Sequence, residues 1–398
     1  MPLPATTPMI NKLIVLCSRL NFSPQDSSKI EYLLESDSNW EQIIKKAAKE
    51  GVAPLLYHNL KKYRGEIPVF AMEQLKRKYQ ISTARNTYIY KNLKAPLQAI
   101  KDSNLRVAIT KGTRLAVTLY QDIGLRPFMD VDLIAHFSDW QNLREILKDL
   151  SFTHNPYGEY ISKHDQERYD WTCYNYFRKD NLLIDIHFDP FDLRLPAKNI
   201  EKFWESARKE NISGIESYVF SPEYEFCKLC VHTQKHSYHP LIWLTDIAEF
   251  SSRGGLDWNQ TLRICREEEI FAPVYYGLHI VNRLWPGTFS NNTINTFKVG
   301  ILKQKLLEFF WPEEKVLSRN TSLKVPFHTP TIFPLLSRKR ILFKLKTLFH
   351  IFFPHQDWVA HFYEIPPNSI KMLLHYAGRF LRLISVFSKF LFRIKGNL

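Results

Sequence analysis

The stretch that decides the fold is Gly124-Leu-Arg-Pro-Phe-Met-Asp-Val-Asp-Leu-Ile-Ala135. Its alternation of apolar and acidic residues predicts a β-strand over residues 129–135, in which successive side chains point to opposite faces. Asp130 and Asp132 therefore share one face of the strand, and the apolar residues between and beside them take the other. Like charges this close repel unless a cation lies between them, and hard oxygen ligands suit Mg²⁺.

A second strand supplies a third carboxylate. Residues 171–177 and 182–188 predict a hairpin across the turn 178–181, and Asp185 and His187 share one face of its second strand. If this strand neighbours 129–135, Asp130, Asp132 and Asp185 form a cluster able to hold two metal ions about 3.5–4 Å apart, as in-line displacement at phosphorus requires. His187 is either a hydrogen-bond partner of these ligands or a packed sheet histidine.

A short turn precedes this region. Thr110-Lys-Gly-Thr113 joins a predicted strand, residues 105–109, to a predicted helix, residues 113–120. A glycine there lets backbone N–H groups approach a phosphate at the helix N-terminus, and Lys111 or Thr113 can add a donor. Downstream, Arg126 either neutralises a triphosphate through its planar fork or is a loop residue paired with a surface carboxylate.

Together these motifs resemble those of a known superfamily. Lys111-Gly112, Gly124-Leu-Arg126 and Asp130-Val-Asp-Leu133 are similar to the DNA polymerase β-like nucleotidyltransferases, and specifically to a bacterial family called uncharacterised nucleotidyltransferases. The resemblance covers most of residues 38–285. It implies that Gly112-Thr113 binds nucleotide phosphates, that the Asp-x-Asp pair holds metal ions and that Asp185 is the third carboxylate.

The implied function is metal-dependent transfer of a nucleoside monophosphate from an NTP to an acceptor hydroxyl, with release of pyrophosphate. The cofactor would be Mg²⁺ or Mn²⁺, and the acceptor a small molecule, a sugar or a protein. The alternative is a catalytically inactive nucleotidyltransferase fold that senses nucleotides or binds a partner. The candidate metal ligands and catalytic residues are Asp130, Asp132 and Asp185, and the candidate nucleotide ligands are Lys111, Gly112, Thr113 and Arg126.

The chain divides by pattern into four regions. We expect an α+β protein in which a small mixed β-sheet, the nucleotidyltransferase core, lies between N-terminal and C-terminal helical regions. From about residue 199 the pattern is mainly helical. The expected regions are an N-terminal helical region (1–100), the α/β core (101–195), a helical domain packing on the core (196–330) and a basic amphipathic helical tail (331–398).

Several helix boundaries can also be predicted. Ser38 with Glu41 has the spacing of a capping box at the start of one helix, and Ser138 with Gln141 has the same spacing at another. A long amphipathic helix over residues 71–101 contains one proline, Pro96, at which a kink is expected.

The net charge of +14 is concentrated near the C-terminus. Residues 333–398 contain 11 Lys or Arg against two acidic residues, which leaves +5 for the remainder of the chain. The tail has three interpretations: an amphipathic helix that completes the core, peripheral contact with an anionic membrane surface, or nucleic-acid binding. Burial against the core is favoured, with Phe380 and Ile384 among the contacts. Cations interrupt the apolar runs, so no transmembrane segment is expected.

The cysteines and histidines complete the sequence evidence. Five cysteines, an odd number, suit reduced thiols better than a disulfide framework, and the N-terminal apolar run is too short for a signal peptide, so we expect a cytoplasmic protein. Cys227 and Cys230 followed by His232 and His236 have a spacing compatible with zinc, but core cysteines are favoured. His232, His236 or Asp246 could lie near the nucleotide.

Overall fold

A seven-stranded mixed β-sheet lies at the centre of the fold, in the order β3-β4-β5-β2-β1-β7-β6. The computed structural model describes residues 7–35, 39–154, 173–191, 200–318 and 369–395, together with 349, 353, 359, 365 and 366. The strands are β1 (Val107–Ile109), β2 (Val131–Ala135), β3 (Thr153–His154), β4 (Cys173–Phe177), β5 (Leu183–His187), β6 (Arg208–Ile212) and β7 (Ile215–Val219).

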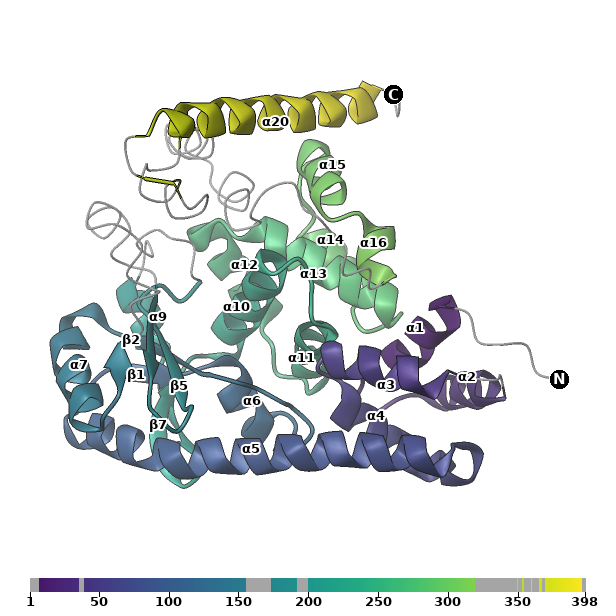
Figure 1. Ribbon diagram of the computed structural model, residues 1–398, viewed down its shortest axis with the longest axis horizontal. Coiled ribbons are helices and arrows are strands. Elements are labelled where there is room, and N and C mark those ends of the chain that lie inside the picture. Colours follow the sequence, from purple (N-terminus) through teal and green to yellow (C-terminus); the bar gives the residue numbers. More distant parts are fainter. Residues whose placement is uncertain are drawn as a thin grey trace.

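In Figure 1 the sheet lies toward the left of the molecule, and most of the helices lie to its right. The α-helices are α1 (Thr7–Leu16), α2 (Pro24–Leu34), α3 (Trp40–Lys49), α4 (Ala53–Leu60), α5 (Val69–Asp102), α6 (Lys111–Thr118), α7 (Trp140–Asp149), α9 (Ile200–Glu205), α10 (Pro222–Lys235), α11 (Leu241–Ser252), α12 (Trp258–Glu268), α13 (Phe271–Leu284), α14 (Asn291–Thr296), α15 (Ile301–Phe310), α16 (Glu313–Leu317) and α20 (Ile370–Lys395). Two 3₁₀ helices, η1 (Lys61–Glu66) and η2 (Phe137–Asp139), precede α5 and α7. The expected α+β class is confirmed.

The two faces of the sheet differ in chemistry, as the alternation of residues predicted. Val131, Leu133 and Ile186 belong to a buried cluster that also contains side chains of α5 and α7. Asp132 and His187 lie on the opposite face, where α6 and α10 pack. One face therefore provides a core, and the other provides polar groups held at defined positions.

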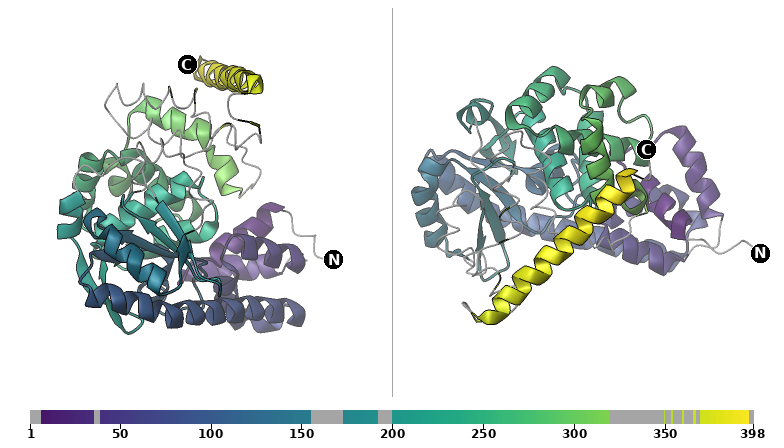
Figure 2. Two further views of the ribbon diagram at one scale, coloured as in Figure 1. Left: turned by 60° about the vertical axis from the view of Figure 1, so that its left-hand side comes forward. Right: turned by 90° about the horizontal axis from the view of Figure 1, so that it is seen from above.

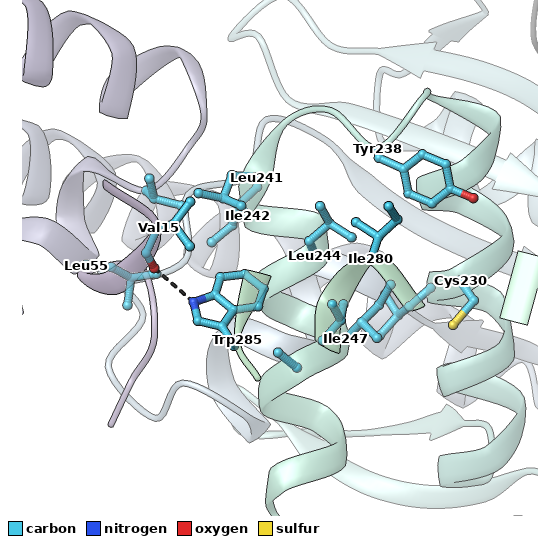
Figure 3. Packing of buried hydrophobic residues seen from close by; sticks show 14 of the residues in the cluster. Val15, Leu55, Cys230, Tyr238, Leu241, Ile242, Leu244, Ile247, Ile280 and Trp285 are labelled. Carbon is cyan, nitrogen blue, oxygen red and sulfur yellow. Dashed lines mark hydrogen bonds between the residues drawn. The ribbon is translucent and has the colours of Figure 1, made fainter. Parts of the chain in front are cut away.

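The N-terminal helices and the helices that follow the sheet share one hydrophobic core. That cluster runs from Ile10 to Val316 and includes side chains of α1, α3, α4, α10, α11 and α13. The indole N–H of Trp285 donates to the carbonyl of Val15 at 2.9 Å, which joins the end of α13 to α1 (Figure 3). The N-terminal helices and the helices between the sheet and residue 317 are consequently packed together beside the sheet.

Two local expectations need correction. Helix α3 is capped by Asn39, whose side-chain oxygen accepts from the N–H of Gln42, whereas the predicted cap Ser38 lies outside the described residues. The Ser138–Gln141 capping box is wrong, because Ser138 lies within η2 and accepts a bond from Arg106. Helix α5 runs continuously from Val69 to Asp102 with Pro96 in its interior, and the kink at Pro96 stays a prediction.

A further hairpin, β6–β7, was not expected from the sequence. The chain was predicted to be mainly helical after residue 199, yet these two strands extend the sheet beside β1. Ser213 and Gly214 form the two-residue loop, and both have positive φ angles, 54° and 92°. A loop of this kind matches the right-handed twist of the strands, and the Ser-Gly pair between alternating residues was the available signal.

Helix α20 confirms that the end of the chain is helical but not that it completes the core. Phe380 and Ile384, predicted to be buried, are 42% and 47% exposed. The segment 338–348, the other half of the amphipathic tail, lies outside the described residues. Within the part of the chain that the structure describes, no helix is both long enough and apolar enough to cross a bilayer.

Candidate metal and nucleotide site

Strand pairing brings the predicted carboxylates together. β2 and β5 are parallel neighbours with Asp132 in register with Asp185. In the described residues, Asp132, Asp185 and His187 form a group in which one ligand atom from each lies within 4.8 Å of the others. β4 and β5 pair antiparallel, which confirms the predicted hairpin, and the pairing of β2 with β5 confirms that the two acidic strands are neighbours.

The composition of the group differs from the expected set of three aspartates. Asp130 lies just before β2, outside the group within 4.8 Å, and His187 occupies the third place. The alternation of Asp185 and His187 along one strand contained this signal, but the choice between a ligand and a packed histidine needed the register. Asp189, another nearby carboxylate, instead accepts from the N–H of Phe191 at 2.8 Å and closes a turn.

Asp132 is the electrostatic centre of the site. Lys111 Nζ lies 2.6 Å from Asp132 Oδ1, and His187 Nε2 lies 3.1 Å from the same oxygen. Burial alone would raise the pKa of Asp132, but attraction to Lys111 and the contact with His187 outweigh it and hold that pKa well below its usual range. Asp132 is thus a carboxylate at neutral pH although it is only 7% exposed.

Asp130 has the opposite electrostatics. Burial raises its pKa, and repulsion from Asp132 raises it further, while Lys111 opposes both effects. The pKa values of the two aspartates in the Asp-x-Asp motif are therefore shifted in opposite directions. Lys111 contacts Asp132 directly, and its weaker attraction to Asp130 does not offset the burial of that carboxylate. A bound cation would relieve the repulsion between them.

The backbone at Lys111 is strained in a way that positions its ammonium group. Lys111 has φ of +53°, in the left-handed region that a residue with a Cβ atom adopts at a cost of about 1 kcal/mol. The N–H of Thr110 donates to the carbonyl of Asp132, which fixes the turn against β2. Glycine would adopt this conformation at lower cost, and the lysine that stands here instead supplies the ammonium group that contacts Asp132.

An internal carboxylate already caps helix α6. Glu225 of α10 is fully buried and accepts from the Thr110 hydroxyl at 2.8 Å and from the Lys111 N–H at 2.9 Å. Arg114 lies 3.5 Å from the other oxygen of Glu225. The helix N-terminus thus binds an anion, as its dipole favours, but that anion comes from the protein.

Gly112 and Thr113 are buried where α6 meets the loop before β2. A Cβ atom on Gly112 would lie 2.9 Å from Phe128 Cβ, so close packing requires glycine here. Thr113 Oγ1 is 3.4 Å from the carbonyl oxygen of Asp130, and its own carbonyl accepts from the Tyr90 hydroxyl at 2.6 Å. These contacts fix the start of α6 relative to Asp130, and phosphate binding by the two residues stays a prediction.

In the structure Arg126 binds a buried carboxylate of the protein, Asp246, and not a free phosphate-binding position. Its guanidinium pairs with Asp246 of α11 at 2.6 Å, and the hydroxyl of Tyr120 donates to the same carboxylate at 2.8 Å. Asp246 has no exposed surface. Burial acts to lower the pKa of Arg126, but Asp246 reverses the effect and raises it. This buried ion pair connects the loop before β2 to helix α11.

Three rings from α10 and α11 lie beside this site. The ring centroids of His232, His236 and Trp243 are 4.5–5.0 Å apart. His232 is close enough to the site that, after burial, the charge of Lys111 is the main factor lowering its pKa. Cys227 and Cys230 are buried thiols, which confirms the interpretation as core residues. Of the three residues considered for a role near the nucleotide, His232 lies near Lys111 and Asp132, His236 lies against His232, and Asp246 binds Arg126 and Tyr120.

The structure thus places clustered metal-type ligands on a parallel strand pair, beside a strand-to-helix turn that presents a lysine. A family model described as "Uncharacterised nucleotidyltransferase" matches residues 36–286, and the chain belongs to this family. No curated protein matches it significantly. Among solved structures it is similar to an antigenic nucleotidyltransferase-like protein from Paracoccidioides brasiliensis, with 16% sequence identity, a TM-score of 0.34, and coverage of 52% of this chain and 92% of that one.

Proposed function

We propose that the protein transfers a nucleoside monophosphate from an NTP to an acceptor hydroxyl and releases pyrophosphate. The observation that supports this most is the register of β2 and β5, which places Asp132, Asp185 and His187 in one group beside Lys111. Membership of the family supplies the class of reaction. Without that group, the fold alone would not indicate chemistry.

The donor set fits a divalent cation. The two carboxylates suit Mg²⁺ or Mn²⁺, which favour oxygen ligands, and the imidazole adds one nitrogen donor. Asp132, Asp185 and His187 would hold the ion, and Asp130, whose charge is disfavoured by its neighbour, would join when the positive charge arrives. A bound ion supplies neutralisation of the phosphate charge that develops during transfer.

The residues of the chain then have distinct roles. The acceptor oxygen forms a bond to the α-phosphorus as the bond from that phosphorus to the bridging oxygen breaks, and pyrophosphate leaves. Asp185 is the least buried of the three clustered residues, so we assign it the proton of the acceptor hydroxyl. Lys111 contacts the phosphates together with the backbone of Gly112 and Thr113, and Arg126 positions the loop that carries Asp130.

The second candidate is a nucleotide-sensing or partner-binding module without transfer activity. Its support is the ion pair between Lys111 and Asp132, which neutralises the central carboxylate without a metal. A protein of this kind would bind an NTP and leave its phosphates intact. Binding and turnover therefore separate the two functions.

The test is incubation with each α-³²P-labelled NTP, Mn²⁺ or Mg²⁺ and fractionated cell extract, followed by detection of labelled product and of pyrophosphate. We expect both products with the wild type and a loss of at least about 100-fold in Asp132→Asn and Asp185→Asn, because the clustered carboxylates are removed. Asp149→Asn, an exposed position on α7, is the matched control. Nucleotide binding without either product would support the sensing module, and unchanged turnover in Asp185→Asn would contradict the assignment of the site.

A further inference from the structure

Helix α20 presents an apolar stripe to solvent. Leu373, Leu374 and Leu381 are 66–71% exposed, and Ile370 and Ile384 are also exposed. Their spacing, i, i+3, i+4, i+11 and i+14 from Ile370, places all five on one side of an α-helix. Exposed apolar side chains usually occur singly on a protein surface, whereas a continuous stripe marks an interaction site.

The rest of the molecule holds α20 by a different side. Met372 is 6% exposed and forms a small buried cluster with Val359, against which Ile365 and Tyr376 also pack. α20 also contacts α15. In Figure 1 the helix lies along the top of the molecule, on the opposite side from α5, and in Figure 2 it crosses over the remaining helices seen from above. No part of the chain that the structure describes covers the stripe.

The charge of α20 selects among possible partners. Its sequence contains six basic residues and no Asp or Glu, and the basic residues are Lys371, Arg379, Arg382, Lys389, Arg393 and Lys395. A second copy of the chain would place two such helices against each other and would be repelled. A nucleic acid would satisfy the cations but leave the leucines in water.

We propose that α20 docks the protein on an anionic lipid surface. The apolar stripe enters the boundary between headgroups and acyl chains, and the cations attract the anionic headgroups. The helix lies in the plane of the interface, consistent with the finding that it is not apolar enough to span a bilayer. This inference concerns where the protein acts, and it holds or fails independently of the transfer reaction.

The proposal predicts two separable contributions to lipid affinity. Each cation near an anionic surface strengthens binding by about fivefold at low salt, and this contribution is screened as ionic strength rises. The apolar stripe contributes a part that salt does not remove. Loss of either contribution should weaken binding, so neutral vesicles should bind the protein much more weakly than anionic ones.

The experiment is sedimentation of the full-length protein with phosphatidylcholine vesicles that contain either no anionic lipid or roughly one third phosphatidylglycerol. The triple variant Leu373→Ser/Leu374→Ser/Leu381→Ser removes the centre of the stripe, and Val69→Ser/Phe70→Ser removes exposed apolar residues at the start of α5 as a matched control. We expect the wild type and the control to bind anionic vesicles, and the triple variant to bind at least about 10-fold more weakly.

Circular dichroism and thermal unfolding check that the triple variant keeps its fold, and Lys371→Glu/Arg382→Glu provides a second variant that leaves the stripe intact. We expect this charge variant to lose preference for anionic over neutral vesicles. Equal binding to both vesicle types by the wild type, or unchanged binding by a folded triple variant, would overturn the proposal. A dimer in light scattering that the triple variant abolishes would instead assign the stripe to a second copy.

Discussion

Two buried carboxylates near β2 are paired with cations, and the pairs differ in ways that separate a structural contact from a candidate reaction site. Asp246 has no exposed surface and is bound by the guanidinium of Arg126 and the hydroxyl of Tyr120. Asp132 is bound by the ammonium of Lys111 and by His187, next to the less buried Asp185. The pair at Asp246 is fully buried. The pair at Asp132 lies beside Asp185, a partly exposed carboxylate that a ligand can reach.

The choice of cation is part of the same contrast. The planar fork of arginine holds a carboxylate in one geometry, which suits a permanent tie between a loop and α11. Lysine carries a compact charge on a flexible chain, and here the backbone is held at a left-handed φ to deliver it. The ammonium group of Lys111 can leave Asp132 and bind a phosphate, or move aside for a metal ion. Nucleotide transfer requires a cation that can move in this way.

The largest effect on stability should come from breaking the pair at Asp246. Asp246→Asn leaves the guanidinium of Arg126 buried without a charge partner, and we expect a loss of about 3–5 kcal/mol in the free energy of unfolding. Urea unfolding measures it. Tyr120→Phe removes only one hydroxyl contact to the same carboxylate, so it should cost about 1–2 kcal/mol. Equal stability of Asp246→Asn and the wild type would mean that the pair is not structural.

A smaller loss is expected at the pair at Asp132. Asp132→Asn deprives Lys111 of its partner, but the flexible ammonium can reorient toward solvent, so we expect a loss of about 1–2 kcal/mol. The stability that the low pKa of Asp132 provides is present at pH values above about 4 and lost as the pH falls toward the lower folded-state pKa. Unfolding measurements between about pH 3 and 7 should therefore show the difference between wild type and variant shrinking in acid.

Asp130→Asn should change stability in the other direction. The pKa of Asp130 is raised, so its ionisation at neutral pH opposes folding, and the opposition disappears as the pH falls below the unfolded value. We expect the variant to be more stable than the wild type by up to about 1 kcal/mol at pH 7 and no more stable near pH 3. Destabilisation of Asp130→Asn at neutral pH would show that its carboxylate is held by favourable contacts instead.

The smallest expected effect concerns His232. Its pKa lies well below the usual value, because of burial and the charge of Lys111, so the folded state disfavours the proton that the unfolded state accepts below about pH 6.5. The free energy of unfolding should therefore decrease as the pH falls below about 6.5, because the unfolded state then binds a proton that the folded state does not. We expect His232→Gln to flatten the slope of stability between about pH 5 and 7, measured by thermal unfolding in matched buffers. The same slope in both proteins would exclude this contribution.

The sequence predicted the elements of the site more fully than their contacts. Alternation along 129–135 and 182–188 was sufficient to place Asp130 with Asp132 on one face of the first strand and Asp185 with His187 on one face of the second, because the period of a strand is fixed. That Asp132 and Asp185 meet depends on the register of β2 and β5, which alternation does not give. It could not show that Glu225, more than a hundred residues away, caps α6, or that Arg126 reaches Asp246, because both contacts depend on how α10 and α11 pack. Likewise, the helical period of α20 was readable, but not which side of it would be exposed.

The most direct test of the central claim is calorimetric titration of ATP with and without Mn²⁺ into the wild type, Asp185→Asn and the control Asp149→Asn. Triphosphate and the clustered carboxylates repel each other until a cation bridges them, and Asp185 supplies one of the proposed ligands. We predict tight binding only with Mn²⁺ in the wild type and control, and binding weakened by at least about 10-fold in Asp185→Asn. Equal affinity with Mn²⁺ and in EDTA, or an unchanged affinity in Asp185→Asn, would contradict the assignment of this cluster as a metal and nucleotide site.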